Sequence, residues 1–175
     1  AYVESAVSRD NMDHSSKVAR DAMDVLKTRV MQSAPGDEGR FEQLSTLTAV
    51  REQFLLARYQ VRAYIAAQTV ANEQAARQQL SEAIASLSAL NTHFSASAPD
   101  TLRTLDGALA QYKQALQVYA DTDKTIADMR KEMTDYGSGI LSRSDELYKI
   151  QLERRDNESA SANTIQLIST LLVLL

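Results

Sequence analysis

The chain has 175 residues, of which 44% are hydrophobic and 24% are charged, with a formal net charge of -4 and no cysteine. This length fits one modest domain or two small helical modules that share long helices. The negative net charge, and the lack of a segment that gathers Lys and Arg, argue against nucleic-acid binding. The absence of cysteine excludes disulfides and thiolate metal sites.

The first part of the sequence has the composition and the spacing of an α-helix. Only two prolines and five glycines occur in the whole chain, and helix-forming residues such as Ala, Leu, Gln, Glu and Arg dominate. We predict a helix over residues 3–32 because residues at spacings of three and four would share one buried face. These residues are Met12, Ser16, Ala19, Met23, Leu26 and Val30. The segment QSAPGDEG around Pro35 then predicts a turn.

Two further helices are predicted over residues 38–70 and 72–95, with Asn72 as a candidate cap between them. The buried face of the first is predicted at Leu44, Leu47, Phe54, Val61 and Ile65. That of the second is predicted at Leu80, Ile84, Leu87, Asn91 and Phe94. The segment SASAPDT around Pro99 predicts another turn, with Ser97 or Asp100 as the cap of the helix that follows.

After Pro99 one pattern with a period near 3.5 residues continues without proline, as in a coiled coil or a four-helix bundle. Its members are Leu102, Leu105, Leu109, Tyr112, Leu116, Tyr119, Ile126, Met133, Ile140 and Leu147. One continuous helix would be about 110 Å long and would outrun its neighbours. We therefore predict a turn at residues 119–125, with Thr122 or Asp123 as the cap, in preference to a break at Gly137 and Gly139. The result is an all-α, elongated antiparallel bundle of five helices.

The end of the chain suggests a membrane. Residues 164–175, TIQLISTLLVLL, carry no charge, and a membrane-spanning helix needs about twenty apolar residues. The segment Leu171 to Leu175 has no polar face, as expected of a helix that enters lipid. We predict an extracytoplasmic helical domain over residues 1–163 and the start of a truncated transmembrane helix over residues 164–175. The alternative is a terminal amphipathic helix that docks on the core.

Three arginines, Arg51, Arg58 and Arg62, lie in the otherwise apolar stretch of residues 50–65. Arg58 falls at the edge of the predicted buried face, about 40° from Phe54 on a helical wheel. Since an arginine is almost never buried without a partner, an anion should meet it. Three readings remain open: the arginines reach water or an acidic residue of the next helix, they bind the carboxylate of a small molecule, or they belong to a protein interface.

Tyr112 and Tyr119 lie on the predicted seam after Pro99. Their hydroxyls could complete a polar pocket, or the rings could belong to the core with the hydroxyls at its rim. Catalytic chemistry finds little support, because the two histidines, His14 and His93, lie on different predicted helices and no HExxH or Glu-x-x-His pair occurs. No Walker loop or nucleophile elbow occurs either. We predict no enzyme activity, no metal and no cofactor.

Taken together, LARYQVRAYI on an early helix and ALAQYKQALQVYADTDKTIADM after a proline turn resemble the ligand-binding region of bacterial methyl-accepting chemotaxis receptors, most closely the helical bimodular type. The resemblance covers roughly residues 40–165. It implies two stacked four-helix modules that share long helices, a sensor domain in the periplasm flanked by inner-membrane helices, and a homodimer. It also implies that a small organic acid binds through arginines, onto which Arg58 and Arg62 map.

One expectation departs from this resemblance. The family fold has six helices, whereas five are predicted here, so a single four-helix bundle on a long stalk is the fallback. A structural coiled-coil protein, such as a membrane-tethered spacer or assembly factor, is the competing function. A sensor histidine kinase would carry the same kind of outer domain.

Overall fold

The computed structural model describes residues 2–33 and 38–173, and these residues form four α-helices without a strand. The helices are α1 (Tyr2–Gln32), α2 (Glu38–Ala66), α3 (Val70–Phe94) and α4 (Pro99–Val173). The prediction of an all-α helical bundle is confirmed. The predicted turn around Pro35 lies outside the described residues. The chain divides into two units, Ala1–Ile126 and Ala127–Leu175.

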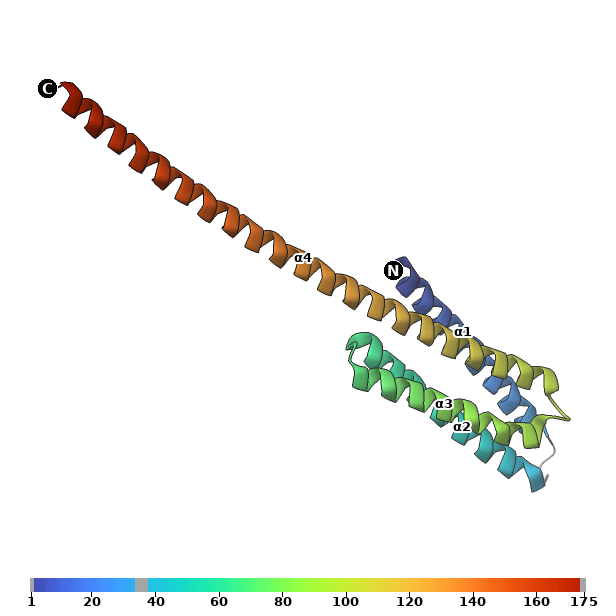
Figure 1. The fold of residues 1–175 in the computed structure, drawn as a ribbon. Helices are drawn as coiled ribbons and strands as arrows, with labels where there is room; N and C mark the ends of the chain where they lie inside the picture. Colours follow the sequence, from blue (N-terminus) through green and yellow to red (C-terminus); the bar gives the residue numbers. More distant parts are fainter. Residues whose placement is uncertain (1, 34–37, 174–175) are drawn as a thin grey trace. The chain divides into compact units, whose positions relative to one another are not determined.

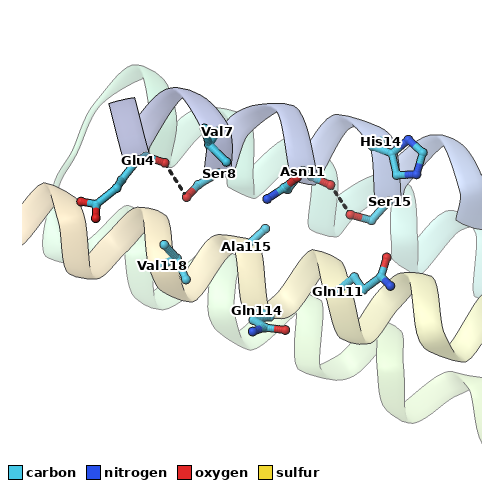
Figure 2. Close-up of a pocket in the computed structure, with 10 residues that line it drawn as sticks. All are labelled: Glu4, Val7, Ser8, Asn11, His14, Ser15, Gln111, Gln114, Ala115 and Val118. Atoms are coloured by element: carbon cyan, nitrogen blue, oxygen red, sulfur yellow. Dashed lines mark hydrogen bonds between the residues drawn. The ribbon is translucent and has the colours of Figure 1, made fainter. Parts of the chain in front are cut away.

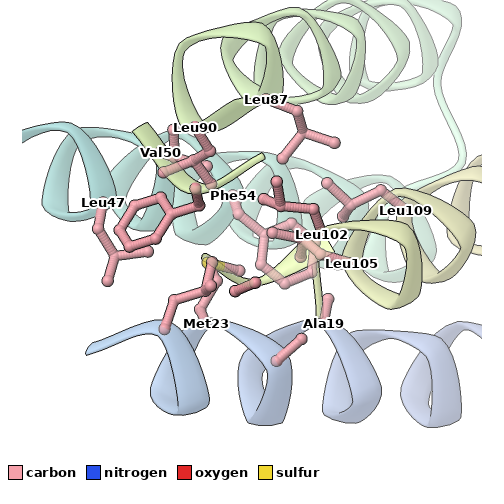
Figure 3. Packing of buried hydrophobic residues seen from close by; sticks show 14 of the residues in the cluster. Ala19, Met23, Leu47, Val50, Phe54, Leu87, Leu90, Leu102, Leu105 and Leu109 are labelled. Atoms are coloured by element: carbon pink, nitrogen blue, oxygen red, sulfur yellow. The ribbon is translucent and has the colours of Figure 1, made fainter. Parts of the chain in front are cut away.

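In the first unit, α1, α2, α3 and the first part of α4 run side by side as an antiparallel four-helix bundle (Figure 1). The predicted faces of α1 and of α4 as far as Tyr119 are buried here, and Ile126 is half-buried. Of the predicted faces of α2 and α3 only Asn91 is exposed. One core cluster is centred on Phe54, which Figure 3 shows between Met23 of α1 and Leu90 of α3. A second cluster joins Val61 and Tyr64 to Tyr112 and Tyr119.

The turns between helices use other caps than those predicted. Thr69 caps α3, since its hydroxyl accepts the Asn72 backbone N–H at 3.2 Å, while the Asn72 side chain donates to the Ala67 carbonyl at 2.7 Å and so closes the end of α2. α4 begins at Pro99, directly after the buried Ala98, and not after Ser97 or Asp100. Proline suits the first helical position because the backbone N–H that it lacks would have no partner there.

The predicted turn at residues 119–125 is wrong, because α4 is helical through this segment. The two residues proposed as caps lie inside the helix: Thr122 is buried, and Asp123 accepts a hydrogen bond from Tyr64 of α2 at 3.4 Å. Neither proline nor glycine is present there to reverse the chain. The described residues therefore form four helices where five were expected.

The second unit consists of the remaining part of α4. Large apolar side chains repeat along it at spacings of three, four and seven and are exposed: Met129, Met133, Tyr136, Ile140, Leu147 and Ile150. Gly137 and Gly139 lie inside the helix, and a Cβ at either position would meet open space. Among the described residues, no helix holds a stretch that is both long and apolar enough to cross a bilayer.

Candidate functional site

The candidate site lies in the first unit, at the seam where α1 and α2 pack against each other. Arg51 and Arg58 of α2 are one heptad apart and therefore lie on the same side of the helix. Arg51 donates to the Asp24 carboxylate of α1 at 3.0 Å. The Arg51 side chain is 43% exposed and the Asp24 side chain is 56% exposed. Arg51 therefore pairs with an acidic residue of another helix, which is the first of the three interpretations given for these arginines.

Arg58 is different, because its half-buried guanidinium makes no hydrogen bond or ion pair with any described residue. Burial lowers the pKa of Arg58, and the nearby charges of Arg20 and Arg62 lower this pKa further. Arg62 is exposed and likewise has no ion-pair partner among residues 2–33 and 38–173. Three cations from two helices thus approach one another at this seam.

Two groups with acidic protons or negative charge face these cations. Asp13 of α1 acts on Arg58 and favours its charged form, as does Tyr112 of α4. Burial raises the pKa of Tyr112 to about 12, against the opposing effect of Arg58. The Tyr112 ring packs edge-on against Phe54, with centroids 5.8 Å apart, and its hydroxyl has no hydrogen-bond partner among the described residues.

Positive charges from Arg20 and Arg62 thus act on Arg58, and Asp13 opposes them. Arg58 is partly buried, whereas Arg20 and Arg62 are exposed, so solvent screens the repulsion least at Arg58. An anion that entered the seam would relieve this repulsion and would find several free N–H donors. The arrangement can bind a carboxylate, and it contains no group that would carry out chemistry on it.

Tyr119, the second predicted tyrosine, lies in a separate polar cluster. Its hydroxyl accepts hydrogen bonds from Arg9 of α1 at 3.0 Å and from Gln68 at 2.9 Å. Arg9 also lies 5.3 Å from the centre of the Tyr119 ring. The Tyr64 ring packs edge-on against the Tyr119 ring at 5.7 Å. Because this hydroxyl is already engaged, Tyr119 ties α1 and the α2–α3 turn to α4 and is not brought together with Arg58.

A groove of about 360 Å³ lies elsewhere in the first unit, between α1 and α4. Figure 2 shows Asn11 and Ser15 of α1 facing Gln111 and Ala115 of α4 across it. No arginine or lysine lines this groove, and none of the five predicted site residues does. The Ser15 hydroxyl already donates to the Asn11 carbonyl. A carboxylate would therefore find no cation here.

Arg20 and Asp13 are the members of the Arg58 cluster that the sequence analysis missed. They lie seven residues apart on α1, and so on one helical face. A helix-by-helix reading of α2 could not reveal them, since the residues that face Arg58 come from another helix. Among residues 2–33 and 38–173, no group of three His, Asp or Glu side chains is arranged to hold a metal ion.

Comparison with known proteins agrees with this bundle. The family model described as "Helical bimodular sensor domain" matches residues 1–162. The chain is 40% identical over 174 residues to the methyl-accepting chemotaxis protein McpS of Pseudomonas putida, covering 99% of this chain and 27% of that protein. It is 25% identical over 167 residues to the methyl-accepting chemotaxis protein McpQ of the same organism, covering 95% of this chain and 25% of that protein.

These matches confirm the resemblance stated from the sequence. The chain spans about a quarter of the length of these two relatives. The matched family is one of sensors and not of enzymes, in agreement with the prediction of no enzyme activity. The chain belongs to the helical bimodular sensor domain family.

Proposed function

We propose that this chain is the periplasmic sensor domain of a chemotaxis receptor in the inner membrane, and that it binds a small organic acid at the seam between α1 and α2. Arg58 and Arg62 hold the carboxylate, and the Tyr112 hydroxyl lies beside it. No metal, cofactor or chemical conversion is involved. The observation that carries this proposal is the half-buried Arg58, which no acidic residue pairs among the described residues.

The contrast with the other predicted residues narrows the site. Arg51 has its own aspartate at 3.0 Å, and the Tyr119 hydroxyl already accepts two hydrogen bonds. A planar guanidinium can hold a carboxylate by two parallel hydrogen bonds, which an unpaired arginine is free to make. We therefore assign Arg58, Arg62 and Tyr112 to the ligand site, and Arg51 and Tyr119 to the support of the bundle.

The transmembrane part of the proposal concerns the end of the chain. Residues 1–163 form the extracytoplasmic domain, and residues 164–175 begin a transmembrane helix that continues α4. The bound acid biases the arrangement of α4 against α1 and α2, and this bias passes into the membrane. Such coupling between two sites amounts typically to about 1–3 kcal/mol. The receptor acts as a homodimer, as the resemblance to chemotaxis receptors implies.

A thermal-shift screen of the isolated chain tests ligand binding. The probes are acetate, succinate and citrate, each compared with a neutral counterpart such as acetamide or succinamide at the same concentration and ionic strength. An acid at 100 times its Kd should add about 2.7 kcal/mol to the free energy of unfolding, and its amide should add nothing. Equal melting temperatures with all of the acids and without them would contradict the proposal.

A structural coiled-coil protein is the second candidate function. It is favoured by the exposed apolar residues at heptad spacing in the second unit, such as Met133, Ile140 and Leu147. A spacer or assembly protein would associate through this face and would not respond to acids. The thermal-shift screen separates the two functions, since only a sensor gains stability from a carboxylate that its amide does not provide.

A further inference from the structure

Ser16 of α1 carries a buried hydroxyl that has no hydrogen-bond partner among the described residues. The residue is only 3% exposed. Its neighbours on the same helix behave differently: the Ser8 hydroxyl donates to the Glu4 carbonyl at 2.8 Å, and the Ser15 hydroxyl donates to the Asn11 carbonyl. Since nearly all buried polar groups in proteins are hydrogen-bonded, an unpaired one calls for a partner of another kind.

The position of Ser16 indicates that this partner is at the Arg58 seam. Ser16 lies three residues after Asp13 and four before Arg20, so the three side chains share one face of α1. Asp13 and Arg20 both lie close enough to Arg58 to act on its charge. The Arg20 guanidinium also reaches back to the Ser16 carbonyl at 3.4 Å. The two helices are antiparallel (Figure 1) and Arg51 pairs with Asp24, so Arg58, seven residues further along α2, lies level with the turn of α1 that holds Ser16.

We propose that Ser16 is a specificity-determining residue of the organic-acid site, and that its hydroxyl donates a hydrogen bond to the carboxylate held by Arg58. This inference rests on the proposed function. A carboxylate has about four acceptor positions on two oxygens, and one guanidinium fills two of them. The other two acceptor positions of the carboxylate remain for uncharged hydrogen-bond donors on the buried side of the seam. Arg58 supplies the charge, and Ser16 supplies the directional contact.

The burial of Ser16 also limits the ligand. Ser16 is only 3% exposed, so a ligand can reach its hydroxyl only if the side chains around it move apart. A small carboxylate on an unbranched end of the molecule would require the least movement. An acid whose carboxylate is flanked by a bulky substituent would reach the exposed Arg62 but not Ser16, and it would bind more weakly.

Isothermal titration of the purified chain tests this inference, with the acid among acetate, succinate and citrate that gives the largest thermal shift. Ser16→Ala should raise the Kd by about ten- to hundredfold, since a hydrogen bond to a charged group is lost. The melting temperature without acid should stay the same or rise, because an unpaired buried hydroxyl is removed. Ser15→Ala is the matched control: the adjacent serine is equally buried, so its replacement should lower the melting temperature and leave the Kd within twofold.

The possible failures are distinguishable. If wild type binds an acid and Arg58→Ala weakens that binding, but Ser16→Ala keeps the wild-type Kd, the role of Ser16 is overturned and the proposed function stands. If Ser15→Ala and Ser16→Ala weaken binding equally, the effect is one of packing and the specific contact is likewise overturned. If wild type binds none of the three acids, the proposed function fails and this inference fails with it.

Discussion

Arg51 and Arg58 occupy equivalent positions one heptad apart on α2, yet their surroundings differ. Arg51 pairs with Asp24 of α1 at 3.0 Å, whereas Arg58 has no ion pair, the charges of Arg20 and Arg62 lower its pKa, and Tyr112 and Asp13 oppose this effect. The same residue type on the same helical face thus serves once as a structural ion pair and once as an unpaired cation. The facing helix, and not the arginine itself, decides which role results.

The largest expected effect comes from removing the unpaired arginine. Arg58→Ala should raise the Kd of the bound acid at least thirtyfold, which corresponds to about 2 kcal/mol, because the main charge contact is lost. Arg51→Ala is the matched control and should leave the Kd within twofold. Isothermal titration measures both. Equal loss of affinity in the two variants would remove the distinction between the two arginines.

The second-largest effect is expected when Arg58 is given an acidic partner from the protein itself, like the Asp24 partner of Arg51. Arg20→Glu replaces a repulsive neighbour with a carboxylate, which should pair with Arg58 and compete with the ligand. We expect about a tenfold higher Kd, together with a gain of up to about 1 kcal/mol in the free energy of unfolding. Arg20→Gln, which removes charge without adding a carboxylate, should weaken binding less. Unchanged acid binding by Arg20→Glu would show that Arg20 does not face the ligand.

A moderate effect on stability alone is expected at the Tyr119 cluster. Tyr119→Phe removes the acceptor of Arg9 and Gln68, so the free energy of unfolding should fall by about 1 kcal/mol. The Kd of the acid should not change, since this cluster is separate from Arg58. Urea unfolding measures the loss, with the exposed Tyr136→Phe as a control that should cost nothing. A changed Kd would mean that the two clusters are coupled.

The smallest effect is expected from breaking the structural ion pair. Asp24→Asn should change the free energy of unfolding by less than about 0.5 kcal/mol, because both partners are largely exposed and screened by solvent. Urea unfolding at low and moderate salt provides the measurement. A loss of several kcal/mol would indicate that Arg51 is far less hydrated than its exposure suggests.

The sequence predicted the interior of the bundle better than its site. The spacing of apolar residues along one helix is enough to predict which of its faces is buried, and residues such as Met23, Phe54 and Leu105 are buried as predicted. The continuity of α4 was missed because Thr122 and Asp123 resemble helix caps when they are read alone. Their role depends on contacts such as the one from Tyr64.

The same reasoning explains why the three arginines could not be separated from the sequence. They lie seven and four residues apart, close to one side of α2, and only the packing of α1 brings Asp24 to Arg51 and Arg20 near Arg58. Ser16 was predicted to be buried on the apolar face of α1, and it is. That its hydroxyl lacks a partner depends on three-dimensional packing, which residue spacing does not contain.

A crystal structure of the sensor domain soaked with succinate tests the central claim most directly. We expect a carboxylate of succinate within hydrogen-bond distance of the Arg58 guanidinium, at the seam of α1 and α2. A succinate bound only in the α1–α4 groove, or an Arg58 side chain turned into solvent beside an empty seam in crystals that hold succinate elsewhere, would contradict it.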